Sequence, residues 1–214
     1  IDGASSKDLD DAVSVEKTDN GWKLGVHIAD VSHYVRGNSA LDKEAMSRGT
    51  SIYYADKVIP MLPKELSNGI CSLNPNEDRL TLSAFMELDK SGEMLSYRFA
   101  KSVIRSRVKG VYTEINAILK GEETPEIAEK YSGVRNEIAL MNELADILIE
   151  KKKRRHAPEI DTTESILVID ENGVCSACKQ YMHNRELSGY HPGESEKKLQ
   201  ETAAMMKEYS KDSD

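Results

Sequence analysis

The sequence predicts an α+β fold in which helices pack against a mixed, largely antiparallel sheet. Apolar and polar residues alternate over residues 22–28 and again over 80–88, which is the pattern of half-buried strands. A turn signal accompanies each run, Asp-Asn-Gly at 19–21 and Asp-Lys-Ser-Gly at 89–92. Residues 134–155 instead carry apolar side chains at helical spacing. With 214 residues the chain is long enough for a sizeable domain with a real core.

The first half of the chain is expected to be mostly strands. Residues 12–15 form a short strand that leads into the hairpin with 22–28, where Trp22, Leu24, Val26 and Ile28 would share one buried face. Ser39 with Asp42 predicts a helix N-cap, and Gly49 its end. Three prolines in 56–79 predict an ordered loop. The strand at 80–88 returns through Leu95, Tyr97 and Phe99.

The second half is expected to be mostly helical. We predict a helix at 112–120 that ends at Gly121, and a long helix at 134–155. Between them, a further helix would carry Pro125 in its first turn. The long helix would bury one face, made of Ile138, Met141, Ala145 and Leu148. Residues 165–170 predict a strand followed by an Asn-Gly turn, and residues 194–209 a charged helix.

Charge and composition exclude some classes of protein. A net charge of −8 argues against binding RNA through charge alone, although the basic run 151–155 could line a path for RNA or simply be a solvated helix end. Three cysteines give no disulfide framework, so we expect reduced thiols and a cytoplasmic protein. No apolar run is long enough for a membrane span, and we expect no membrane partner.

The most informative feature is a group of four aspartates in the first eleven residues, Asp2, Asp8, Asp10 and Asp11. Carboxylates held close together repel one another, and a divalent cation that prefers oxygen ligands offsets the repulsion. The alternative is a solvated Asp- and Gly-containing turn. An EF-hand calcium loop is disfavoured, because Gly3 precedes the cluster instead of standing inside it.

Four stretches, in order, give the chain its resemblance to a known family. They are residues 1–13 (IDGASSKDLDDAV), 21–35 (GWKLGVHIADVSHYV), 48–63 (RGTSIYYADKVIPMLP) and 66–80 (LSNGICSLNPNEDRL). The chain resembles the catalytic RNB domain of the ribonuclease II and ribonuclease R family. The resemblance implies a Mg²⁺-dependent exoribonuclease that degrades single-stranded RNA processively from its 3′ end to nucleoside 5′-monophosphates.

The resemblance also implies roles for single residues. Asp2, Asp8, Asp10 and Asp11 match the family's four active-site acids and would hold one or two Mg²⁺ ions. We hypothesise that Asp2 and Asp11 coordinate directly, while Asp8 and Asp10 act in catalysis by orienting metal-bound water or hold a second ion. Tyr53 matches the tyrosine that stacks near the 3′-terminal base, with Tyr54 as the substitute if the register is off by one. Its alternative role is that of a half-buried strand tyrosine.

The resemblance does not extend over the whole expected domain. We assign residues 1–178 to the N-terminal part of the RNB domain and 179–214 to a divergent, charged, helical tail. The family's later arginine segment, which contacts phosphate near the scissile bond, is missing. Because the chain opens at Ile1, nothing would anchor Asp2, and the α-ammonium would lie beside the carboxylates. We therefore expect a fragment of a monomeric parent that also carries OB-type RNA-binding modules.

Several alternatives stay open at this point. The chain could be a catalytically inactive RNA-binding or scaffold remnant of an RNB protein, or an acidic metal-binding protein that is not a nuclease. Cys175 and Cys178, with His183 and His191, have a loose zinc-ligand spacing, although a chance Cys-x-x-Cys is the simpler interpretation. Structural or surface roles are expected for His27 and His33, and Cys71 is expected in the core.

Overall fold

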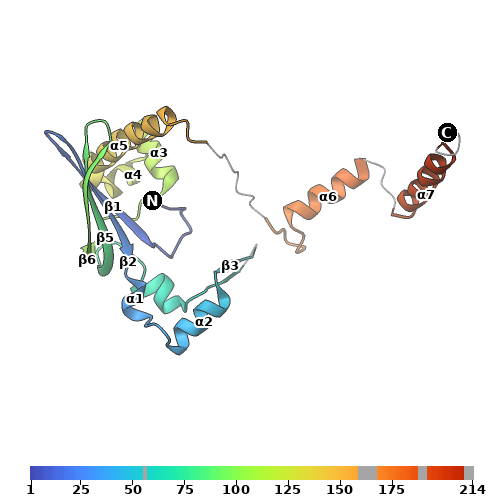
Figure 1. The fold of residues 1–214 in the computed structure, drawn as a ribbon, viewed down its shortest axis with the longest axis horizontal. Helices are drawn as coiled ribbons and strands as arrows, with labels where there is room; N and C mark the ends of the chain where they lie inside the picture. Colours follow the sequence, from blue (N-terminus) through green and yellow to red (C-terminus); the bar gives the residue numbers. More distant parts are fainter. Residues whose placement is uncertain (55–56, 159–167, 188–191, 210–214) are drawn as a thin grey trace. The chain divides into compact units, whose positions relative to one another are not determined.

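The structure is a computed structural model that describes residues 1–54, 57–158, 168–187 and 192–209 (Figure 1). It divides into two compact units. The first comprises Ile1–Ile52 and Val58–Ile160, and the second comprises Tyr53–Lys57 and Asp161–Asp214. The predicted boundary between residues 178 and 179 stays a prediction.

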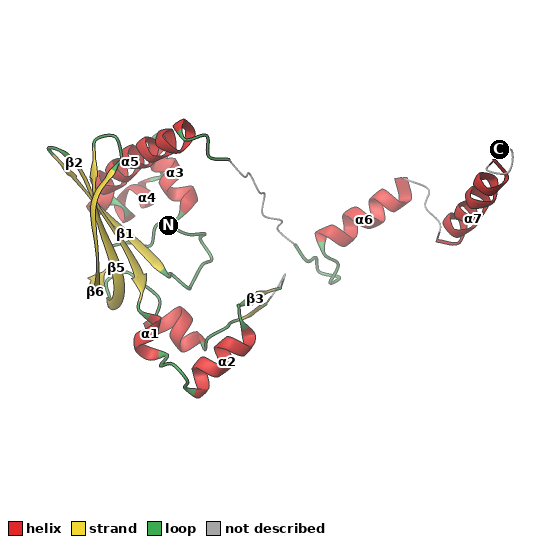
Figure 2. Ribbon diagram, in the orientation of Figure 1, coloured by secondary structure: helices red, strands yellow, loops and turns green. Residues whose placement is uncertain are grey.

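A four-stranded sheet with the order β1-β2-β5-β6 is the framework of the first unit (Figure 2). Its strands are β1 (Asp11–Thr18), β2 (Gly21–Ala29), β5 (Asp78–Asp89) and β6 (Met94–Arg105). Every neighbouring pair is antiparallel, and the described parallel pairing is confined to isolated bridges. Both predicted turns are confirmed. At the first, Gly21 is required because a Cβ there would overlap the carbonyl oxygen of Leu88.

The helices and short elements of the first unit follow the predicted signals closely. Ser39 caps α2, since its side chain accepts a hydrogen bond from the amide of Asp42, and Gly49 ends that helix in the left-handed conformation. The predicted loop after residue 56 contains one short strand and a single π-helical turn. These elements are α1 (Val31–Tyr34), α2 (Ala40–Arg48), β4 (Val58–Ile59), η1 (Glu65–Ile70), α3 (Tyr112–Lys120), α4 (Pro125–Lys130), η2 (Ser132–Val134) and α5 (Arg135–Arg154). The short strand β3 (Ile52–Tyr53) has one residue in each unit.

The long helix α5 packs on one end of the sheet. Trp22, Leu88 and Leu144 form the buried centre of that contact. The predicted buried face of the helix was wrong in part, because Ala145 is exposed and Leu144 takes the core position. The reason is that α5 serves two clusters: Leu144 faces the sheet, while Ile138 turns towards α3 and Tyr131. The helical spacing of apolar residues in the sequence predicts one buried face and cannot show that the helix contacts two separate clusters.

The rest of that sheet face is not covered by described residues. Ile28 is 47% exposed, so the prediction that it belongs to a continuous buried face of β2 was wrong. α5 covers only the end of the sheet near Trp22, and burial therefore stops before the strand does. Other apolar side chains of this face are also exposed, namely Val13, Leu82, Tyr97, Phe99 and Val103.

The opposite face of the sheet holds a buried polar group. His27 lies between two serines, with Nδ1 2.7 Å from Ser83 Oγ and Nε2 3.0 Å from Ser14 Oγ. Burial lowers the pKa of His27, which favours the neutral ring. The structural role predicted for this residue is confirmed. His33 is an exposed side chain that packs edge-on against Tyr34, as expected of a surface group.

The second unit contains two helices, α6 (Ser176–Leu187) and α7 (Pro192–Tyr209). The charged helix predicted at 194–209 is confirmed. A turn closed by Gly173 joins the bridged residues Ile169 and Cys175, as the Asn-Gly signal predicted. Residues 165–167 of the strand predicted at 165–170 lie outside the described residues, and of the other three only Ile169 forms a β-bridge. Of the helices described, none has the length and apolar character needed to cross a membrane.

Candidate active site

The candidate site is the segment from Asp2 to Asp11, called here the aspartate loop. It ends where the sheet begins, because the carbonyl of Asp10 accepts a hydrogen bond from Ala29 (3.0 Å) and Asp11 pairs with Ile28 across β1 and β2. Leu9 is buried at 6% exposure and packs against Ala29 and Leu73. One apolar anchor therefore fixes the backbone between Asp8 and Asp10.

A second segment holds the middle of the loop. Ser72 is fully buried, and its Oγ accepts a hydrogen bond from the Leu9 amide (3.0 Å) and lies 3.0 Å from the carbonyl oxygen of Lys7. The amide of Leu73 donates to the Leu9 carbonyl at 2.8 Å. The motif at residues 66–80, far away in the sequence, thus fixes the residues on both sides of Asp8.

A third segment holds the start of the loop. The amide of Asp2 donates to the carbonyl of Gly110 (2.9 Å), and its carbonyl accepts from the amide of Tyr112 (3.1 Å). The expectation that nothing anchors Asp2 was therefore wrong, because Val111 pairs with it as a parallel bridge. The α-ammonium of Ile1 lies 3.7 Å from the Asp2 carboxylate, as expected.

The sequence did not reveal two further residues that support the loop. Lys109 donates from Nζ to the carbonyl oxygens of Ala4 (2.9 Å) and Ser6 (2.5 Å). Tyr131 is fully buried, and its hydroxyl accepts a hydrogen bond from the Val111 amide and lies 3.2 Å from the Lys109 carbonyl. No local pattern marks either residue, since the atoms they hold are far away along the chain.

The charges of the loop converge on Asp10. Its pKa is raised, first by burial of part of the side chain and then by the charges of Asp8, Asp11 and Asp2. Much of the residue remains exposed, which moderates the effect. Asp8, Asp11 and Asp2 therefore lie near enough for their charges to act on Asp10, and their shared role as metal ligands stays a prediction. Repulsion between them disfavours the fully ionised state in the absence of a cation.

The donor chemistry of the loop fits Mg²⁺, which binds oxygen ligands and carboxylates in particular. The geometry is more open than a finished coordination shell. Among the described residues, no three His, Cys, Asp or Glu side chains lie closely enough to hold one ion. The loop gathers the charges that a cation would neutralise, and the approach of the ligands would accompany binding.

A buried carboxylate, Asp30, and a buried thiol, Cys71, lie near the aspartate loop. The Asp30 carboxylate is 6% exposed, accepts a 2.6 Å hydrogen bond from Ser32 and pairs with Lys101 at 3.2 Å. The Ser32 hydrogen bond is the largest cause that lowers the pKa of Asp30. Cys71 is 3% exposed, which confirms its predicted core position, and burial raises its pKa. The charge of Asp10 adds to that rise, so Cys71 lies close to the acids.

The tyrosine predicted to stack on RNA belongs to the second unit. Tyr53 lies on β3 with its side chain 68% exposed, and Tyr54 is 59% exposed. Neither is a half-buried strand tyrosine, and an exposed ring is what stacking on a base requires. Contact with RNA stays a prediction for both.

The Cys-x-x-Cys pair also belongs to the second unit. The amide of Cys178 donates to the sulfur of Cys175 (3.3 Å), and this bond is the main cause that lowers the pKa of Cys175. Both thiols are free. His191 lies outside the described residues. Zinc binding by this pair stays a prediction.

Comparison with known proteins places this geometry in a family. The family model described as "RNB domain" matches residues 1–207. This chain is a member of the RNB domain family. Ribonuclease R 1 of Lactococcus lactis is 47% identical over 175 residues, and ribonuclease R of Thermotoga maritima is 50% identical over 175 residues. Each of these RNB alignments covers 81% of the chain.

Solved structures agree with the RNB assignment. Mycoplasma genitalium RNase R in complex with ribose-methylated single-stranded RNA is similar at a TM-score of 0.74 and 32% identity. That match covers 81% of this chain and 27% of the solved chain. The α+β prediction is thereby confirmed. The chain spans 21% and 24% of the two ribonucleases named above, so it corresponds to a limited part of them.

Proposed function

We propose that the chain provides the acidic part of a Mg²⁺-dependent exoribonuclease active site. The reaction would be processive hydrolysis of single-stranded RNA from its 3′ end to nucleoside 5′-monophosphates. The observation that carries the proposal is that three carboxylate charges act on Asp10, whose pKa is raised by burial and by those charges. Family membership and relatives that are named ribonuclease R support it.

The residues of the loop would divide the work. Asp2 and Asp11 would hold Mg²⁺ and, with it, a phosphate oxygen of the RNA. Asp8 and Asp10 would orient the attacking water, and a carboxylate with a raised pKa is a better proton acceptor than an ordinary one. One or two bound Mg²⁺ ions would supply positive charge at the phosphate and lower the pKa of bound water. Tyr53 would stack on a base near the 3′ end.

The proposal includes the setting in which the site works. The three free cysteines support a reducing compartment, the cytoplasm. OB-type modules elsewhere in the parent protein would add to the RNA affinity of this acidic chain, and the parent would act as a monomer. The relatives' greater length and the charge of −8 support the OB-type modules, and the modules and the monomeric state are both open to direct measurement on the parent protein.

The proposal is tested by separating cleavage from binding. Asp10→Asn keeps the shape of the side chain but removes its charge, and we expect hydrolysis of oligo(A) to fall by at least ~100-fold while RNA binding stays within about twofold. Loss of a partner outside the metal's own ligands typically costs ~10–100-fold, and loss of a ligand should cost more.

The matched control is Asp146→Asn, which removes one exposed carboxylate from α5 and should leave hydrolysis unchanged. Equal hydrolysis by the wild type and Asp10→Asn would refute the role of Asp10. RNA binding without any cleavage by the wild-type chain would support the alternative of an inactive remnant.

A further inference from the structure

The C-terminal end of α5 concentrates positive charge that the proposed reaction does not use. Five cationic residues follow one another from Lys151 to Arg155, and His156 comes next. In a chain with a net charge of −8, such a run stands out. Residues 151–156 are called here the basic end of α5.

Ion pairs with acidic residues of the chain neutralise only some of these cations. Lys151 pairs with Glu93 at 2.9 Å and also donates to the carbonyl of Gly92, while Lys153 pairs with Glu150. Lys152 and Arg155 make no ion pair with any of the residues that the structure describes. Both are exposed. Arg154 likewise makes no ion pair with the described residues, so three cations are left, and two of them, Lys152 and Arg155, line the concavity beside the helix.

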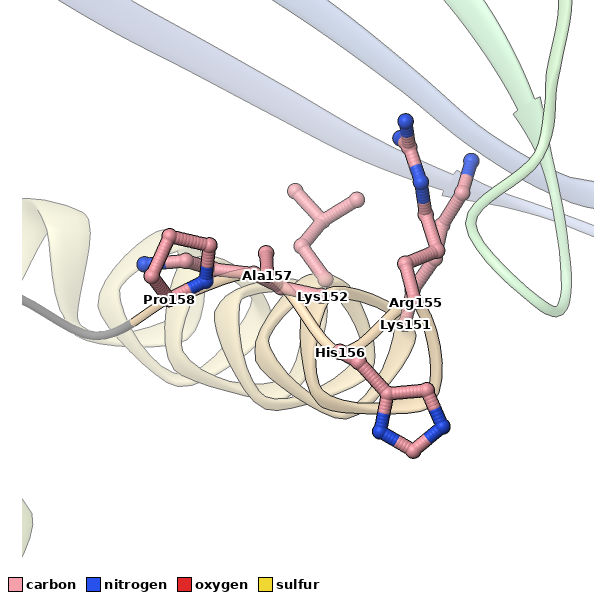
Figure 3. Close-up of a pocket in the computed structure, with 7 residues that line it drawn as sticks. Lys151, Lys152, Arg155, His156, Ala157 and Pro158 are labelled. Atoms are coloured by element: carbon pink, nitrogen blue, oxygen red, sulfur yellow. The ribbon is translucent and has the colours of Figure 1, made fainter.

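Helix physics also accounts for only part of it. The dipole of a helix favours cations in its last turn, which explains one or two of them. Residues four apart lie on the same helix face, so Lys151 and Arg155 are neighbours of like charge, an arrangement that destabilises a helix. Figure 3 shows these two side chains extending together in the same direction. Glu93 already pairs with Lys151, which leaves Arg155 as the member of this pair that is open to an anion.

The backbone at this end is fixed by a helix cap. The amide of His156 donates to the carbonyl of Lys153 (2.9 Å), and the amide of Ala157 donates to that of Lys152 (3.3 Å). His156 takes the left-handed conformation, with φ of 51°. This cap turns the chain so that a concavity of about 590 Å³ opens beside the helix. Its lining combines cations with apolar carbon from Leu148, Ala157 and Pro158 (Figure 3).

We propose that the basic end of α5 is a phosphate-binding surface for the RNA backbone, separate from the aspartate loop. Lys152 and Arg155 supply the free charges, and the arginine fork matches two oxygens of one phosphodiester. The choice of RNA as the polyanion rests on the proposed function. An acidic catalytic loop needs cationic contacts elsewhere along the substrate, because its own charges repel phosphates.

The test measures binding alone. Fluorescent oligo(A) is titrated with the chain in EDTA, where Mg²⁺-dependent cleavage is absent, over a series of salt concentrations. A single-stranded phosphate contact contributes a slope of about 0.7 in log K against log salt, so removing two should lower the slope by about 1.4. We expect this change, with weaker binding, for the double variant Lys152→Gln and Arg155→Gln.

The matched control is the double variant Lys43→Gln and Lys120→Gln, which removes the same charge from exposed positions on α2 and α3. An equal change of slope in both variants would overturn the proposal, because net charge alone would then be responsible. An unchanged slope in the α5 variant would overturn it as well. A third outcome would also overturn it: the α5 variant loses binding of inorganic phosphate but keeps the wild-type salt slope for RNA. The site would then bind free phosphate and not RNA.

The same measurement distinguishes this inference from the proposed reaction. If the wild type does not cleave RNA but the α5 variant has the lowered salt slope, the exonuclease proposal fails and the phosphate surface stands. If the wild type cleaves RNA and the α5 variant keeps the wild-type salt slope, the exonuclease proposal stands and the phosphate-binding surface fails. Circular dichroism of each variant checks that the fold is retained.

Discussion

The aspartate loop and the basic end of α5 both gather like charges, but they are held in different ways. The loop is fixed by hydrogen bonds from segments near residues 29, 72 and 110, all distant in the sequence. The basic end is one helical turn with its cap, and its cations are long side chains that, apart from Lys151, are exposed to solvent. Carboxylates that are to share an ion need fixed positions, whereas contacts to a flexible polyanion do not. The backbone support of each region matches the ligand we propose for it.

The strongest way to break this comparison is to loosen the loop at Ser72. Ser72→Ala leaves the buried amide of Leu9 without its acceptor, and an unsatisfied buried donor costs about 1–3 kcal/mol of stability. Because Asp8 and Asp10 flank Leu9, we expect Mg²⁺ affinity to fall by about 10–100-fold, as for other residues that orient metal ligands. Calorimetric titration with Mg²⁺ and urea unfolding measure the two effects.

Ser132→Ala is the control, since that exposed hydroxyl donates only to the carbonyl of Glu129 in its own turn. Its effect on unfolding should stay within about 0.5 kcal/mol. If Ser72→Ala lowers stability but leaves Mg²⁺ affinity unchanged, the loop does not need its backbone clamp, and the contrast between the two regions is lost.

Lys109 offers a milder perturbation of the same loop. Lys109→Met removes the two hydrogen bonds to the carbonyls of Ala4 and Ser6 while keeping the length of the side chain. We expect Mg²⁺ affinity to fall by about tenfold, the lower end of the range for positioning residues. Lys109→Arg should restore most of it. A merely electrostatic role would give the opposite sign, because removal of a nearby cation would strengthen binding of Mg²⁺.

The smallest expected effect is the pH dependence of Asp10. Its pKa is raised above the usual 3.8, so between those two values the folded chain binds more protons than the unfolded one. The favourable contribution of this group to folding is therefore present at low pH and is lost as pH rises through the raised pKa. In EDTA, Asp10→Asn should gain thermal stability relative to the wild type across that window.

The comparison of melting temperatures at several pH values measures this directly, because titrating groups that do not interact with Asp10 cancel in the difference. Added Mg²⁺ should then stabilise the wild type more than Asp10→Asn at neutral pH, since only the wild type relieves its repulsion by binding the ion. A difference in melting temperature that does not vary with pH would show that Asp10 titrates as an ordinary aspartate.

The sequence predicted what depends on neighbouring residues. The turns at Gly21 and Gly92, the Ser39 cap and the aspartate cluster are all local patterns, and the structure contains each of them. Burial was predicted less well: Ile28 was expected inside and is exposed, because its burial depends on which helix covers that end of the sheet.

The supporting residues of the site were missed for a related reason. Ser72 and Lys109 act on backbone atoms 63 to 105 positions away, and no spacing in the sequence links such partners. Tyr131 likewise supports the loop through Val111, one step removed from the acids. The aspartates could be recognised because they are close together in the sequence. The residues that fix their backbone are distant in the sequence and come near only in the folded chain.

The central claim, that the aspartate loop carries metal-dependent hydrolysis, is tested most directly with 5′-labelled oligo(A). The chain is incubated with the RNA first in Mg²⁺ and then in excess EDTA. The account predicts a ladder of products that shortens from the 3′ end in Mg²⁺ and stops in EDTA. Cleavage that continues in EDTA, or no cleavage in Mg²⁺, would contradict it.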